Sequence, residues 1–138
     1  MLARHLFNLL LSMTYGSPVF IQDGALAALE RELPEVAELR EDYRKRAGLL
    51  TELLEQAPRC RVVPPEGGMF VLLDVRGSGL DGAAFALALL EREGVAVLPC
   101  DGFGASAAGH LRIALSAPEP RLREAGERIQ RFARALAA

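Results

Sequence analysis

The sequence GHLRIALS, residues 109–116, predicts a β-strand that carries a charge in its middle. Alternation with a period of two separates two faces. The apolar face carries Leu111, Ile113 and Leu115. The other face carries the charged Arg112 among residues that are small or polar, namely His110, Ala114 and Ser116. A partly buried guanidinium needs an anionic partner or access to solvent because it cannot lose its charge. The nearest acidic residues, Asp101 and Glu119, lie outside the strand, so the expected partner is another segment or a ligand.

Three further stretches have the composition of strands. They are CRVV at residues 60–63, GMFVLLDV at 68–75 and VAVL at 95–98. The second stretch is apolar on both faces, which is typical of an inner strand.

Apolar residues that recur every three or four positions predict amphipathic helices. One helix begins after Pro34 and carries Val36, Leu39, Tyr43, Ala47, Leu50 and Leu54. Another, near the C-terminus, carries Leu122, Ala125, Ile129, Phe132 and Leu136, with Pro118 and Pro120 at its start. A third runs from the N-cap Asp81 to Glu93, where Gly94 can adopt the left-handed backbone that ends a helix. A shorter helix is predicted at about residues 21–32.

The apolar run at the start of the chain ends near Met13, so it is too short to span a bilayer. It lacks a small-x-small cleavage site and Asn8 interrupts it, which argues against a signal peptide. We therefore predict a helix that requires a partner surface.

The order of these elements is helices, two strands, a helix, two strands and a helix. This order predicts an α+β fold, with a small, mostly antiparallel sheet that packs helices on one face and follows a long connecting helix. The 138 residues are 51% hydrophobic, which is enough for one compact core. The formal net charge is −2 and no basic patch contains interleaved aromatic residues, which argues against a nucleic-acid partner.

Charged and sulfur-containing residues suggest no further site. The basic run Arg44, Lys45 and Arg46 has acidic neighbours, as on a solvated helix face. Cys60 and Cys100 have no partner at metal-ligand spacing, so we expect no metal site and two reduced, mostly buried thiols in a cytoplasmic protein.

Three motifs together resemble a known family. They are PPEGGMFVLLDV at residues 64–75, EREGVAVLPCDGFG at 91–104 and GHLRIALS at 109–116. In this order and spacing they resemble the small C-terminal domain of class I and II aminotransferases of fold type I, which depend on pyridoxal 5'-phosphate. TYGSPVFIQDGALAAL, residues 14–29, is similar to the family segment that follows the cofactor-binding lysine. The resemblance implies a small domain at residues 35–138 and, at 1–34, a segment of the large-domain and dimer-interface region.

The resemblance assigns roles to several residues. Arg112 matches the arginine that binds the substrate α-carboxylate, and a planar fork with two parallel donors suits that task. The alternative is an arginine that pairs with a core carboxylate or reaches solvent. Gly67, Gly68 and Phe70 match a loop and strand start near the substrate entrance. The glycines would equally form an ordinary turn.

Further matches lie in the loop before the last strand and near the N-terminus. Pro99, Phe103 and Gly104 match a loop that faces the active site, or they form a turn with a core aromatic residue. Cys100 stands where many relatives have glycine. Tyr15 and Ser17 match residues that cross the dimer interface toward the active site of the neighbouring subunit. The alternative for both is a Gly-Ser-Pro turn before a helix.

The cofactor chemistry of the family requires a lysine. There, pyridoxal phosphate forms a Schiff base with a lysine, its protonated ring is an electron sink, and the freed lysine moves the substrate α-proton. The only lysine in this chain is Lys45, in the charged context DYRKRAGLL. We therefore predict that this chain alone binds no cofactor covalently and does not transaminate, because a large domain expected before residue 1 supplies that lysine.

The predicted function is a part of a cytoplasmic, homodimeric transaminase that moves an amino group from an amino acid to a 2-oxo acid. Two alternatives stay open. One is the ligand-binding aminotransferase-like domain of a transcriptional regulator, and the other is a non-catalytic α+β binding module. His110, beside Arg112, either tunes substrate binding or caps a face of the sheet.

Overall fold

The structure is a computed structural model that describes residues 2–31 and 33–137. The chain divides into two compact units, Met1–Glu38 and Leu39–Ala138. The boundary falls inside one long helix, α3, which spans Pro34–Leu54.

The first unit contains the helices α1, Leu2–Thr14, and α2, Val19–Leu29. Neither helix has a buried residue, so their large apolar side chains are exposed within this unit. Helix α2 corresponds to the helix predicted at about residues 21–32, and it begins and ends earlier than predicted. It begins earlier because the carbonyl oxygen of Pro18 accepts hydrogen bonds from the backbone N–H groups of Ile21 and Gln22. The predicted end, Glu32, lies outside the described residues.

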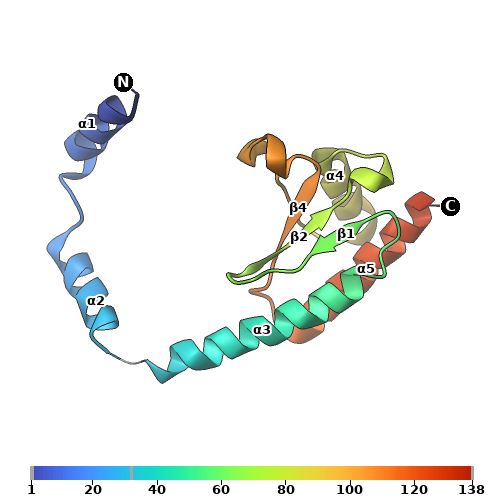
Figure 1. The fold of residues 1–138 in the computed structure, drawn as a ribbon, viewed down its shortest axis with the longest axis horizontal. Helices are drawn as coiled ribbons and strands as arrows, with labels where there is room; N and C mark the ends of the chain where they lie inside the picture. The colour runs from blue at the N-terminus through green and yellow to red at the C-terminus, as the bar shows by residue number, and fades with distance from the viewer. Residues whose placement is uncertain (1, 32, 138) are drawn as a thin grey trace. The chain divides into compact units, whose positions relative to one another are not determined.

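The second unit is built on a four-stranded antiparallel sheet in the order β1-β2-β4-β3, and Figure 1 shows β2 between β1 and β4. Its strands are β1, Arg61–Val63; β2, Phe70–Asp74; β3, Leu98–Pro99; and β4, His110–Ala114. The strand predicted to be inner, β2, lies between β1 and β4, as expected. The predicted α+β fold with a small antiparallel sheet is confirmed.

Strand β3 is shorter than predicted. The stretch at residues 95–98 was expected to be a strand throughout, but only Leu98 and Pro99 pair with β4. Val95 is instead buried in the core, directly after Gly94 ends the preceding helix. Because Pro99 has no N–H to donate, β3 suits its position at the edge of the sheet.

Helices cover one face of this sheet, as predicted. They are the C-terminal half of α3, α4 (Gly82–Glu93) and α5 (Glu119–Ala137). Their buried residues form one cluster with Val71, Leu73, Leu111, Ile113 and Leu115 from β2, β4 and the residue after β4. In this cluster the rings of Phe85 and Phe132 meet edge to face, with 4.9 Å between their centroids.

Local signals place the ends of α4 as predicted. The Asp81 carboxylate accepts a 2.7 Å hydrogen bond from the backbone N–H of Ala84, and Gly94 adopts a left-handed backbone with φ of 67°. In α3, the predicted apolar face is buried only toward the C-terminal end, at Leu50 and Leu54. Val36 and Leu39, nearer the start of the helix, are exposed.

Candidate functional site

The face of the sheet opposite the helices carries Arg112 in an apolar row. Across the strands, Val63 of β1 is paired with Leu72 of β2, Leu72 with Arg112 of β4, and Arg112 with Leu98 of β3. Leu72 and Leu98 are 36% and 42% exposed, so this row is open at the surface of the unit. Within β4, Arg112 shares this face with His110 and Ala114, as the alternation predicted, whereas its cross-strand neighbours Leu72 and Leu98 are apolar.

Two phenyl rings flank the guanidinium of Arg112. Its central carbon lies 4.3 Å from the ring centroid of Phe70 and 5.3 Å from that of Phe103. Phe70 opens β2, where it is paired with Ala114 and is therefore a diagonal neighbour of Arg112 on the same face. Phe103 ends the 3₁₀ helix η2, Asp101–Phe103, in the loop between β3 and β4.

No carboxylate of the described residues holds Arg112. Within residues 2–31 and 33–137 its side chain takes part in no salt bridge. The nearest acidic residues in sequence are otherwise engaged. Asp101 accepts a 3.3 Å hydrogen bond from the backbone N–H of Gly109, and Glu119 pairs with Arg123 at 3.4 Å. Among the described residues, Arg112 thus pairs with no core carboxylate.

The glycines of the predicted entrance loop are exposed beside β2. Gly68 has a left-handed backbone, with φ of 81°, which side chains other than glycine rarely adopt. A Cβ atom added to Gly67 or Gly68 would meet no other atom within 4 Å. The conformation of Gly68 therefore serves the turn, and the space above both glycines is open.

The loop between β3 and β4 joins the same region. Pro99 belongs to β3, and Gly104, with φ of 114°, follows Phe103. Cys100 is buried, its thiol lies 3.9 Å from the carbonyl oxygen of Leu98, and burial raises its pKa. The sheet thus brings Arg112, Phe70 and Phe103 together, with the glycine loop next to Phe70.

His110 is buried two residues before Arg112. Its Nδ1 lies 3.1 Å from the carbonyl oxygen of Ala108, and its strand partner is Asp74. The Asp74 carboxylate accepts hydrogen bonds from Arg76 Nε at 2.9 Å and from the Arg76 backbone N–H at 3.1 Å. These bonds hold the pKa of Asp74 well below its usual range. The role of His110, in substrate binding or as a cap of the sheet, stays a prediction.

Tyr15 and Ser17 belong to the first unit. Tyr15 is 91% exposed and has a left-handed backbone, with φ of 51°, at the end of α1. Ser17 is also exposed, in the turn before α2. Their assignment to a partner subunit's active site stays a prediction.

Lys45 does not fit a covalent pyridoxal phosphate site. Its side chain is 64% exposed on α3, and its ammonium group lies 4.0 Å from the Glu41 carboxylate. A Schiff-base lysine needs a sheltered position beside the substrate. No cluster of three metal-ligating side chains occurs among the described residues, and none of their helices has the length and hydropathy to cross a membrane.

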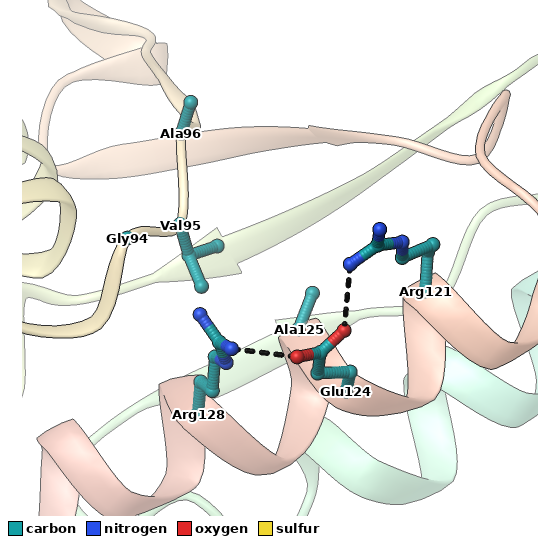
Figure 2. A pocket seen from close by; sticks show the side chains of 7 residues that line it. All are labelled: Gly94, Val95, Ala96, Arg121, Glu124, Ala125 and Arg128. Atoms are coloured by element: carbon teal, nitrogen blue, oxygen red, sulfur yellow. Dashed lines mark hydrogen bonds and ion pairs between the residues drawn. The ribbon is translucent and has the colours of Figure 1, made fainter.

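A hollow between α5 and the end of α4 was not predicted from the sequence (Figure 2). Glu124 accepts hydrogen bonds there from Arg121 at 3.2 Å and Arg128 at 2.6 Å, and Arg128 also donates to the carbonyl oxygen of Glu93 at 2.7 Å. The sequence signal for this network is the spacing of three and four residues between Arg121, Glu124 and Arg128, which places opposite charges side by side on one helix. These charges satisfy one another and cap α4, so the hollow differs from the surface around Arg112.

Comparisons with known proteins give a consistent result. A family model described as aminotransferase class I and II matches residues 3–129. The chain is similar to the arginine–pyruvate transaminase AruH of Pseudomonas aeruginosa, with 52% identity over 93% of this chain and 33% of that protein. It is 30% identical to an aspartate aminotransferase of Pyrococcus horikoshii, over 81% of this chain and 29% of the relative.

Solved structures show the same similarity. The aromatic aminotransferase of Pyrococcus horikoshii OT3 superposes with a TM-score of 0.77 and 31% identity, over 84% of this chain and 31% of that one. The chain spans about a third of the length of these curated relatives.

Proposed function

The chain belongs to the class I and II aminotransferases, and from this premise we propose that it supplies the substrate-carboxylate-binding small domain of a transaminase. The complete enzyme moves an amino group from an amino acid to a 2-oxo acid. The observation that carries the proposal is Arg112, a guanidinium without a carboxylate partner among the described residues, on the open face of the sheet.

Arg112 binds the α-carboxylate by two parallel N–H···O hydrogen bonds. A planar guanidinium presents donors in a fork that matches the two oxygens of a carboxylate. Amino acids and 2-oxo acids both carry this group, so the same residue serves the donor and the acceptor.

The apolar row strengthens this contact. Val63, Leu72 and Leu98 present no polar side-chain group that would compete for Arg112. A substrate that covers this row displaces water, and an ion pair is stronger where water is excluded. The open loop at Gly67 and Gly68 leaves room for the substrate to approach.

The remaining parts of the reaction lie outside this chain in our proposal. Because Lys45 does not fit, the Schiff-base lysine and pyridoxal phosphate belong to the rest of the protein. Residues 35–138 are then the small domain, and residues 1–34 belong to the large-domain and dimer-interface region. We place the enzyme in the cytoplasm as a homodimer in which Tyr15 and Ser17 reach the partner subunit's active site.

The similarity to an arginine–pyruvate transaminase supports arginine and pyruvate as the first substrates to test. In the test, this chain replaces the matching third of the Pseudomonas enzyme, and alanine formed from arginine and pyruvate is measured. We expect an active chimera. Arg112→Ala removes a charged contact of roughly 1.5–3 kcal/mol, so kcat/KM should fall by about 10- to 100-fold for both substrates.

The matched control is Arg123→Ala, which removes an exposed arginine from α5 and should leave kcat/KM unchanged. Arg112→Lys should recover only part of the loss, because an ammonium group keeps the charge and loses the fork. An equal loss in the Arg123 and Arg112 variants would contradict the proposal. An inactive chimera whose Tm rises with arginine would favour the non-catalytic ligand-binding alternative.

A further inference from the structure

We infer that Phe70 and Phe103 are positioning residues that hold the Arg112 guanidinium between their rings for a substrate carboxylate. The inference rests on the proposed function, since it assigns the support of Arg112 and not the binding of the carboxylate itself. The two rings orient the guanidinium of Arg112 before the substrate binds.

The geometry fits a cation–π contact with each of the two rings. The distances from the central guanidinium carbon to the ring centroids, 4.3 Å for Phe70 and 5.3 Å for Phe103, are both within the 6 Å over which a ring attracts a cation. A free arginine side chain has several rotatable bonds, and fixing them costs conformational entropy on binding. Rings that hold the cation beforehand lower this cost.

The rings restrain Arg112 without using its hydrogen-bonding capacity. A phenyl ring has no carboxylate or carbonyl oxygen to compete for the N–H donors. No salt bridge engages Arg112 among residues 2–31 and 33–137. The donors therefore stay available for a carboxylate while the guanidinium is confined, whereas a carboxylate partner within the protein would occupy them.

The two rings come from segments of different character. Phe70 is fixed by the β2–β4 register, where it faces Ala114. Phe103 stands between Gly102 and Gly104 in the loop and is 61% exposed. Truncation of Phe103 thus removes little core packing, so its effect on substrate binding can be separated from an effect on folding.

The kinetic test uses the chimera described above. Phe103→Leu and Phe70→Leu should each raise KM for arginine and for pyruvate by roughly threefold to tenfold with kcat unchanged, as for loss of binding common to ground and transition states. Phe103→Tyr and Phe70→Tyr keep the ring and should restore KM. Leu87→Ala, which removes an exposed apolar side chain from α4, is the control and should leave KM unchanged.

A double-mutant cycle tests whether the rings act through Arg112. In the Arg112→Ala background, Phe103→Leu should have no further effect on KM. An equal effect in both backgrounds would overturn the inference. If Arg112→Ala raises KM and neither leucine variant does, this inference alone fails. If Arg112→Ala itself has no effect, the proposed function fails.

A spectroscopic measurement on the 138-residue chain checks the geometry without catalysis. Protons above a ring face resonate upfield, so the side-chain N–H of Arg112 should be shifted upfield relative to that of Arg123 in an NMR spectrum. Phe70→Leu and Phe103→Leu should each remove part of this shift. A resonance at the ordinary arginine position in the unsubstituted chain would refute the arrangement, whatever the kinetics show.

Discussion

Arg112 of β4 and Leu72 of β2 are directly opposed cross-strand partners, so Arg112 faces a leucine and not a carboxylate. A charge in this position contributes little to folding, because it forms no ion pair with the residues that the structure describes and keeps contact with solvent.

Replacement of Arg112 by alanine should therefore spare the fold. We expect Arg112→Ala to change the free energy of unfolding by less than about 1 kcal/mol, the scale of an exposed cation–π contact. Urea denaturation of both chains measures the difference. A loss of roughly 3–5 kcal/mol would instead reveal a buried ion pair and contradict the proposed role of Arg112.

Asp74 should make stability depend on pH in the acid range. Hydrogen bonds from the Arg76 side chain and backbone, which outweigh the effect of burial, hold the pKa of its carboxyl well below the ordinary range. The stabilisation from the ionised Asp74 carboxylate is therefore complete above about pH 4, the ordinary pKa of an aspartate, and is lost as the pH falls below that value. Asp74→Asn should cost about 2 kcal/mol at pH 7, the scale of charged hydrogen bonds.

The same comparison at low pH supplies the check. Urea denaturation from pH 7 to pH 2 should show that the wild type and Asp74→Asn converge as the acid form is populated. A constant difference across the range would mean that the ion pair is not the cause.

Two glycines should respond to alanine in opposite ways. Gly48 is exposed within α3 with no atom in the way of a Cβ, so Gly48→Ala should stabilise the chain by roughly 0.5–1 kcal/mol. At Gly77 a Cβ would collide with the backbone carbonyl of Arg59, so Gly77→Ala should destabilise by about 1–3 kcal/mol. Thermal unfolding ranks the two variants. A Gly77→Ala variant as stable as the wild type would show that the segments carrying Gly77 and Arg59 move apart without cost.

Both cysteines should resist thiol reagents in the folded chain. Burial, with a smaller contribution from the Asp74 charge, raises the pKa of Cys60 to about 11, and burial raises that of Cys100. Since the thiolate reacts, Cys60 should react with an aromatic disulfide at pH 8 about a hundredfold more slowly than a free thiol. Unfolding in urea should release both thiols. A rapid phase in the native chain would disprove the shielding.

The sequence alone determined the features that depend on neighbouring residues. Asp81 and Gly94 mark the ends of α4 because a cap needs one side-chain acceptor and one left-handed backbone. The alternation around Arg112 gave the buried face of β4 because successive residues of a strand point to opposite sides. The family resemblance likewise depended on motifs that are each continuous in the chain.

The tertiary structure decided what surrounds those features. Whether Arg112 meets a carboxylate, and which rings flank it, depends on the β2–β4 register and on the loop that carries Phe103. β3 is short because Val95 fills the core, which is a demand of packing and not of strand propensity. Local patterns describe the backbone of one segment, whereas the partners of a side chain come from segments that meet only when the chain folds.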